Sequence, residues 1–161
     1  LAAATAISQW VLLGLTISIK SMSFDSTTSR QSVIQGWLAA LATKMEPAEG
    51  ILLGSPTYFA DVSAGTRALI ERTGYVARAN DYMFKRKVGA GVIAVRRGGA
   101  IHAFNSLNLF FFYQQIINPG SSYWAFAMGR EPGEVLNDAE GIQTMKTLGQ
   151  NMAWLLKKIH G

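Results

Sequence analysis

The chain has 161 residues, of which 49% are hydrophobic and only 16% are charged. This length suits one ordinary domain, and the composition is typical of a folded protein rather than a disordered one. We therefore expect a single domain over residues 1–161. Because charged residues fall below the usual quarter, we also expect apolar surface that a second subunit covers, which predicts a homodimer or homotetramer.

The composition argues against metals and membranes. The sequence contains no cysteine and only two histidines, His102 and His160, which lie far apart along the chain. It therefore offers no ligands for a disulfide, a thiolate-bound zinc or a cysteine-ligated cluster, and we predict no metal site. The best apolar run, Val11 to Ile19, is too short to cross a bilayer. We expect a cytoplasmic protein with no membrane partner.

Basic residues are concentrated in the middle of the chain. Between Val62 and Ala100 there are eight basic and two acidic residues, a local net charge of +6 against +5 for the whole chain. Such a region attracts phosphates, nucleotides or nucleic acid. The basic residues are Arg67, Arg72, Arg78, Lys85, Arg86, Lys87, Arg96 and Arg97.

Hydrophobic periodicity predicts alternating helices and strands in the first half of the chain. The predicted elements are a helix over residues 1–13, a strand over 15–20, a helix over 33–45 that stops before Pro47, and a strand over 50–55. Ser63 can cap a following helix that runs to Arg72, with Gly74 placed to end it.

The second half continues the alternation. Val88 to Val95 reads as a buried strand whose glycines allow close helix packing, and a helical stripe follows over residues 101–115. Ile116 and Ile117 are a weak strand signal before a turn, and Asp138 caps a long amphipathic helix that reaches Ile159. The order predicts an α/β fold: a doubly wound parallel sheet in three α/β/α layers, with a ligand site at the carboxyl ends of the strands.

Two loops leave neighbouring predicted strands at those carboxyl ends. The first, Gly54 to Phe59, offers backbone groups for the polar edge of a flat heterocycle and an aromatic side chain for its face. The second, Val95 to Gly99, offers glycines, helix amides and an arginine that could stabilise negative charge on a reduced flavin. The alternatives are an ordinary connecting loop with one buried aromatic residue and a solvated arginine pair.

Other candidates have simpler interpretations. We interpret Lys85 to Lys87 as a solvated charge run and His102 as a structural histidine rather than a proton donor. The aromatic clusters at residues 110–113 and 123–124 suit core packing or a subunit interface. We predict no catalytic side chain.

The sequence segments at these loops strongly resemble the flavodoxin-like NADPH-dependent FMN reductase family, and multimeric flavodoxins and iron–sulfur flavoproteins in particular. The resemblance covers residues 50–159 and rests on GILLGSPTYFADVSAGTRALIERTGYVARAN, KVGAGVIAVRRGG, NPGSSYW, GREPGEV and DAEGIQTMKTLGQNMAWLLKKI. It implies that FMN is the cofactor and NAD(P)H the electron donor. The residues that it assigns to FMN binding are Ser55, Pro56, Thr57, Tyr58, Phe59 and Ala60 in the first loop, and Arg96, Arg97, Gly98 and Gly99 in the second.

The sequence departs from the family in three places. Family members commonly have Gly where Ala60 stands, which predicts a tighter fit there. The cysteine cluster of the iron–sulfur branch is replaced by Ser21 to Ser29, which excludes such a cluster here. The first strand and the loop that wraps the FMN phosphate have no counterpart, so we expect the sequence to be incomplete at its amino terminus, or another segment or subunit to fill that gap.

The resemblance implies an FMN-dependent oxidoreductase that passes electrons from NAD(P)H to a small acceptor such as a quinone or free flavin. One alternative is a flavodoxin-like electron-transfer protein without efficient NAD(P)H turnover, and another is an oligomeric scaffold that no longer binds FMN. Nucleic-acid binding through the basic region is the least favoured hypothesis and predicts a steep salt dependence.

Overall fold

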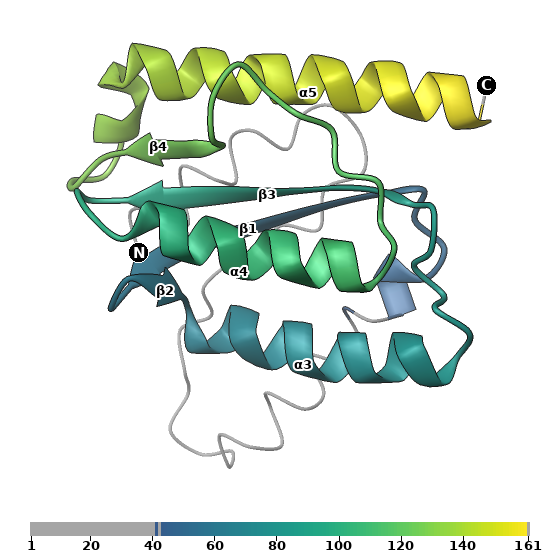
Figure 1. Ribbon diagram of the computed structural model, residues 1–161. Coiled ribbons are helices and arrows are strands. Elements are labelled where there is room, and N and C mark those ends of the chain that lie inside the picture. Colours follow the sequence, from purple (N-terminus) through teal and green to yellow (C-terminus); the bar gives the residue numbers. More distant parts are fainter. Residues whose placement is uncertain (1–40, 42, 161) are drawn as a thin grey trace.

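The computed structural model describes residue 41 and residues 43–160 (Figure 1). Their elements are β1 (Gly50–Tyr58), β2 (Asp61–Val62), α3 (Ala64–Ala79), β3 (Val88–Val95), α4 (Ala100–Tyr113), β4 (Phe126–Met128), a short 3-10 helix at Glu134–Asn137, and α5 (Ala139–His160). The predicted helix and strand before residue 33, and most of the helix over residues 33–45, lie outside the described residues. Residues 43–45 are helical and a turn follows at 46–47, so this helix does stop before Pro47 as predicted.

The described strands form one sheet in the order β2-β1-β3-β4. Strands β1, β3 and β4 are parallel, whereas the two-residue strand β2 pairs antiparallel with the end of β1. The three parallel strands follow one another along the chain with only the short strand β2 between β1 and β3, so two consecutive crossovers, through α3 and α4, link adjacent parallel strands. The prediction of a parallel sheet is therefore confirmed for these three strands.

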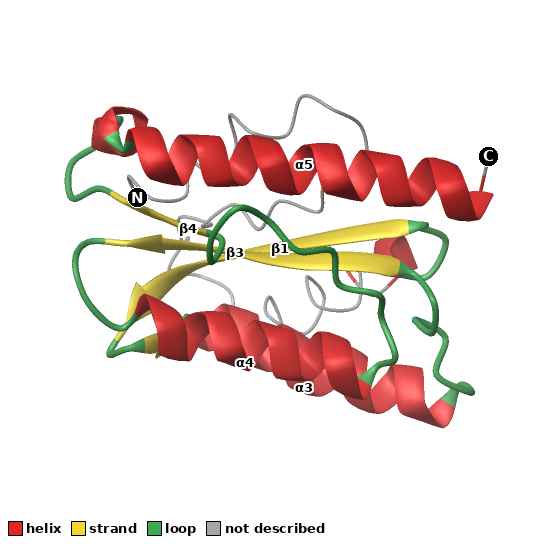
Figure 2. Cartoon of the chain, turned by 45° about the horizontal axis from the view of Figure 1, so that its top comes forward, coloured by secondary structure: helices red, strands yellow, loops and turns green. Residues whose placement is uncertain are grey.

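Helices cover both faces of the sheet. Helix α5 lies on one face, and α3 and α4 lie on the other (Figure 2). The larger core fills the α3/α4 side, where Ile51, Leu53, Leu69, Leu107 and Phe111 are fully buried. The predicted role of the β3 glycines is also seen here: a Cβ added at Gly91 would lie 2.8 Å from Leu107 Cδ1, so this glycine lets α4 pack directly on the strand.

Three local predictions hold. Strand β3 has the predicted bounds. The Ser63 side chain accepts a hydrogen bond from the Thr66 N–H and caps α3. Asp138 caps α5, since its Oδ1 accepts from the Gly141 N–H at 2.9 Å.

The predicted end of the helix that follows Ser63 is wrong. Helix α3 continues through Gly74 to Ala79. The reason is a tertiary contact: a Cβ at Gly74 would lie 3.3 Å from Gln114 Nε2, and that amide donates to the Gly74 carbonyl at 3.2 Å. Gly74 therefore serves close packing of α3 on the end of α4 rather than termination.

The position of the last strand is also wrong. Ile117 forms only an isolated bridge with Val88, and the strand that pairs with β3 is β4, nine residues further on. Between them the chain leaves the sheet at residues 118–125 before it returns to pair Phe126 with Ile93. The short run Phe126–Met128 carries too weak a periodic signal to be recognised without its partner strand.

Candidate functional site

The first predicted loop is a β-hairpin rather than an open connection. Strand β1 continues through Thr57 and Tyr58, which pair with Val62 and Asp61 of β2. The two residues of the turn, Phe59 and Ala60, have φ of 49° and 63°. A two-residue hairpin turn with both φ values positive is usually built from Asn and Gly, so this turn stores backbone strain.

Pro56 is tolerated inside β1 because of where its missing N–H would point. The Val88 N–H donates to the Glu49 carbonyl, so alternate residues of β3 face β1, and Ala94 is one of them. Ala94 pairs with Pro56, which places the bonds to β1 on the residues flanking the proline. The nitrogen of Pro56 thus faces away from β3, as at an edge strand.

Asp61 ties the hairpin to both helices on its face of the sheet. Its Oδ1 accepts from the Val62 N–H and the Ser106 hydroxyl, each at 2.7 Å, and its Oδ2 accepts from Arg67 Nη2 at 2.7 Å. The Ser106 hydrogen bond, helped by the Val62 N–H and Arg67, holds the pKa of this carboxyl below its ordinary value against the opposing effect of burial. Asp61 thereby fixes the strained turn to α3 and α4.

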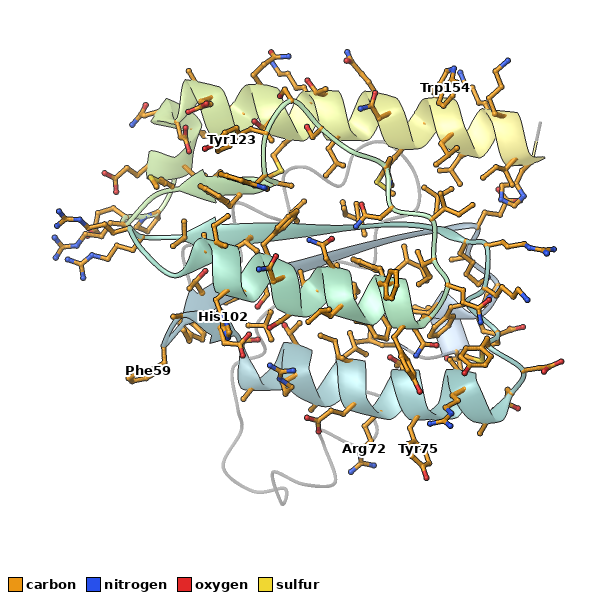
Figure 3. All side chains as sticks on the ribbon, in the orientation of Figure 1. Phe59, Arg72, Tyr75, His102, Tyr123 and Trp154 are labelled. Carbon is orange, nitrogen blue, oxygen red and sulfur yellow. The ribbon has the colours of Figure 1, made fainter. Side chains whose placement is uncertain are left out.

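His102 stands beside this carboxylate. Its Nε2 lies 3.8 Å from Asp61 Oδ2, and its side chain is 71% exposed. Phe59 projects from the turn away from the fold, and His102 lies on α4 near the same end of the molecule (Figure 3).

The second predicted loop meets the first, as expected. Gly99 has φ +88°, and a Cβ there would lie 2.7 Å from the Ala60 Cα and 3.2 Å from Thr57 Cγ2. Only glycine permits this approach, so the start of α4 packs directly on the hairpin. The two loops lie together at the carboxyl ends of β1 and β3, at the left of Figures 1 and 2.

The predicted residues of these loops divide into two groups. Ser55 is fully buried and its hydroxyl is used internally: it accepts from the Ser63 N–H at 2.9 Å and donates to the Pro56 carbonyl at 2.8 Å. Thr57 Oγ1, in contrast, is buried with no hydrogen-bond partner among the described residues. Arg96, Arg97 and Gly98 are exposed, and neither arginine pairs with a carboxylate of the described chain.

Sequence reasoning missed Asp61 and Ser106. The two residues are 45 positions apart in the sequence, and the fold brings their side chains into hydrogen-bond contact. An aspartate directly after a predicted loop is a common turn residue, so no sequence signal distinguished this one.

The basic residues do not form one cluster. Arg67, Arg72 and Arg78 lie along α3, while Lys85 to Lys87 precede β3 and Arg96 and Arg97 follow it. Strand β3 has eight residues, so these last two groups are about 25 Å apart. Lys87 is not simply solvated: its Nζ donates to the carbonyls of Glu46 and Ala48, each at 2.7 Å, and partial burial lowers its pKa.

The predicted aromatic cluster at residues 110–113 is split between core and surface. Phe110 and Phe111 are buried, whereas Phe112 is 82% exposed and Tyr113 is 52% exposed.

In the described part of the chain, no helix is long and apolar enough to span a bilayer.

Comparison with solved structures defines the class of fold. The chain is similar to the Trp repressor binding protein of Bacillus subtilis, with a TM-score of 0.61, 13% identity, and coverage of 69% of this chain and 74% of that one. It is also similar to the flavodoxin WrbA-like protein of Agrobacterium tumefaciens, with a TM-score of 0.52, 16% identity, and coverage of 73% of each chain. These likenesses show a flavodoxin-like α/β fold.

Comparison of sequences gives the family. The profile described as NADPH-dependent FMN reductase matches residues 11–131, and the chain belongs to this family. An iron–sulfur flavoprotein of Methanocaldococcus jannaschii is 33% identical over 123 residues, which are 72% of this chain and 63% of that protein. An iron–sulfur flavoprotein of Archaeoglobus fulgidus is 30% identical over 105 residues, 64% of this chain and 52% of that protein. The chain thus spans between half and two thirds of the length of these relatives.

Proposed function

We propose that the protein is an FMN-dependent oxidoreductase that takes a hydride from NAD(P)H and passes electrons to a small acceptor such as a quinone or free flavin. The observation that carries this proposal is the contact of Gly99 with Thr57 and Ala60, which brings the two predicted flavin loops together at the strand ends. The family to which the chain belongs supports the same chemistry. The finer points, NADPH or NADH and the acceptor, are part of the proposal.

The residues at the strand ends fit an isoalloxazine ring. A buried hydroxyl without a partner normally costs free energy, and among the described residues Thr57 Oγ1 has no partner. A hydrogen bond to a ligand would satisfy it. In the second loop, a Cβ added at Gly98 would meet nothing within 4 Å, and Arg96 and Arg97 are exposed and pair with no described carboxylate.

When bound there, FMN supplies the redox chemistry of the reaction. The chain's own residues orient and tune it. Thr57 would bond the ring's polar edge, Tyr58 would border its face, and Arg96 or Arg97 would favour the negative charge of a reduced ring. Asp61 and Ser55 act as positioning residues, because both hold the hairpin through hydrogen bonds and neither needs to touch the ligand.

The proposal is tested by reconstitution of the purified protein with FMN. We expect stoichiometric uptake at micromolar FMN, a flavin absorbance spectrum, and oxidation of NADPH or NADH with menadione as the acceptor. A protein that stays colourless under these conditions would refute the oxidoreductase and favour the scaffold hypothesis. A protein that binds FMN, accepts electrons from dithionite, but does not oxidise either nucleotide would instead be an electron-transfer flavoprotein.

We also propose that the protein forms a homodimer or homotetramer through α4. This helix exposes an apolar stripe at helical spacing, formed by Ile101, Leu109 and Phe112. We expect Leu109→Glu combined with Phe112→Glu to give a monomer by light scattering. Val76→Glu combined with Tyr75→Glu, which alters exposed residues of α3, is the matched control and should leave the assembly intact.

A further inference from the structure

A hollow lies away from the strand ends, at the edge of the sheet beside β3. Its volume is about 440 Å³, within the range of small-molecule sites. Helices α4 and α5 and the chain over residues 118–125 enclose it, and we call it the edge pocket. The residues that define it are Gly91, Phe104, Asn108, Asn118, Tyr123 and Trp124. None of them belongs to the two flavin loops.

The strand beside the edge pocket has unpaired backbone groups. Residues of β3 alternate in direction: the Gly89 N–H donates to the Ile117 carbonyl and the Ile93 N–H donates to the Ala125 carbonyl, both on the β4 side. Gly91 lies between them and faces the same way. Because the chain leaves the sheet at residues 118–125, no described residue bonds the N–H or the carbonyl of Gly91 on that side.

Burial makes these two groups significant. Gly91 is buried, and buried backbone groups are nearly always paired. The N–H and C=O of one extended residue point the same way, as in an antiparallel pair that exchanges two hydrogen bonds with an adjacent donor and acceptor. Gly91 therefore presents one hydrogen-bond donor, its N–H, and one acceptor, its carbonyl, side by side to the pocket that it lines.

The walls of the edge pocket are already held in place. Asn118 donates to the side chain of Asn108 at 2.5 Å, and Asn108 donates to the Phe104 carbonyl at 3.0 Å, which ties the loop to α4. On the other side, Ser121 donates to the Thr144 carbonyl at 2.6 Å, and Asn151 donates to the Gly120 carbonyl at 2.7 Å. Because these walls are already ordered, little conformational entropy would be lost when a ligand binds.

Aromatic side chains provide the remaining contact area. Tyr123 and Trp124 pack edge to face with ring centroids 4.5 Å apart, and both are half exposed at the rim. Phe104 contributes from α4. Such a lining suits a flat aromatic ring. A further strand does not fit, because pairing resumes at Ile93 and leaves a gap of one residue.

We propose that the edge pocket binds a planar aromatic lactam, whose C=O accepts from the Gly91 N–H and whose N–H donates to the Gly91 carbonyl. The ring packs among the aromatic side chains of the rim and of α4. This site is separate from the proposed flavin site and does not depend on it.

Titration with 2-quinolinone, followed by calorimetry and by the backbone amide resonances of the protein, tests the proposal. We expect saturable binding that shifts the Gly91 amide proton downfield. N-methyl-2-quinolinone is the matched control, because it lacks the lactam donor; it should bind at least ~10-fold more weakly. Equal binding of the two compounds, or no binding of 2-quinolinone at millimolar concentration, would overturn the proposal.

Paired variants locate the site. Trp124→Ala should weaken binding by roughly 5-fold or more, since it removes part of the aromatic lining. Trp154→Ala, at an exposed position on α5 (Figure 3), should leave it within about 2-fold. If Trp124→Ala does not fold, Tyr123→Ala serves the same purpose. Affinity that is lost equally in both tryptophan variants, or 2-quinolinone that is displaced by FMN, would place the ligand elsewhere and reject the edge pocket.

Discussion

The two ends of strand β3 both carry basic residues, but the fold uses them differently. At the amino end, the Lys87 ammonium donates hydrogen bonds to the carbonyls of Glu46 and Ala48, and Val88 is fully buried. At the carboxyl end, Arg96 and Arg97 are exposed and pair with no described carboxylate. The same residue types therefore stabilise the structure at one end and remain available at the other.

Backbone strain and unmet hydrogen bonding occur near both ends: at the amino end, Arg86 has a φ of 66° and the buried Gln114 Oε1 has no partner among the described residues. At the carboxyl end, the turn residues Phe59 and Ala60 have positive φ, and the buried Thr57 hydroxyl has no partner in the described part of the chain. A protein tolerates such strain and such unpaired groups where a bound ligand supplies compensating interactions. The comparison teaches that unused hydrogen-bonding capacity marks the candidate site only together with the unpaired arginines and the contact of Gly99 with Thr57 and Ala60, which occur at the carboxyl end.

The largest test of this contrast is Gly99→Ala. The new Cβ would meet the Ala60 Cα at 2.7 Å, and φ is +88°, so we expect a loss of about 3 kcal/mol in the free energy of unfolding. FMN affinity should fall at least ~100-fold because the two loops separate. Gly98→Ala, with nothing within 4 Å of its added Cβ, is the matched control and should change stability by about 0.5 kcal/mol or less. Chemical denaturation and FMN titration measure both, and equal losses in the two variants would contradict the loop contact.

Lys87→Met tests the other end of β3. It leaves two carbonyls without their donor, so we expect a loss of about 2 kcal/mol in the free energy of unfolding. FMN affinity should be unchanged. Lys85→Met, at an exposed position, should cost about 0.5 kcal/mol or less. Equal stability of the two variants would show that the Lys87 hydrogen bonds do not stabilise the fold. Lys87 would then not differ from Arg96 and Arg97, and the contrast between the two ends would be wrong.

Thr57→Val sharpens the comparison because it predicts effects of opposite sign. The substitution removes a buried hydroxyl for which residues 43–160 supply no partner, so the free energy of unfolding of the apoprotein should rise by about 1 kcal/mol. FMN affinity should fall about 10-fold because the ligand loses a hydrogen bond. Thr66→Val is the control: that hydroxyl bonds Ser63 at 2.9 Å, and its loss should destabilise the protein. Destabilisation by Thr57→Val would show that its hydroxyl is satisfied.

The smallest expected effect concerns the acid limb of stability. The pKa of Asp61 is lowered in the folded protein, so its contribution is present above the unfolded value near 3.8 and is lost as the pH falls through the folded pKa. We expect less than about 1 kcal/mol, since the carboxylate is partly exposed to solvent. Ser106→Ala removes the largest cause and should raise this pKa, which carboxyl NMR titration measures. An unchanged titration would mean that Ser106 does not hold the carboxylate.

Much of the fold was predictable from local pattern. The apolar run Val88 to Val95 marked β3 with its true bounds, and Ser63 and Asp138 marked the starts of α3 and α5. The convergence of the two loops also followed from strand order, because carboxyl ends of adjacent parallel strands meet at one edge. Periodicity and capping depend on neighbours within a turn or two, which the sequence contains.

The failures have a common cause in contacts between distant residues. Gly74 looks like a helix end until Gln114 is seen to bond its carbonyl. Phe126–Met128 is a strand only because β3 pairs with it, and the Asp61–Ser106 bond joins residues 45 positions apart.

The sequence alone thus determined helices α3, α4 and α5 and strands β1 and β3 as elements, since those depend on short-range spacing and caps. Only the tertiary structure decided which glycines serve close packing, where the last strand rejoins the sheet, and which buried polar groups are left unpaired. These features depend on pairs of residues that are distant in sequence, because a hydrogen bond or a close contact forms only when the fold brings both residues together.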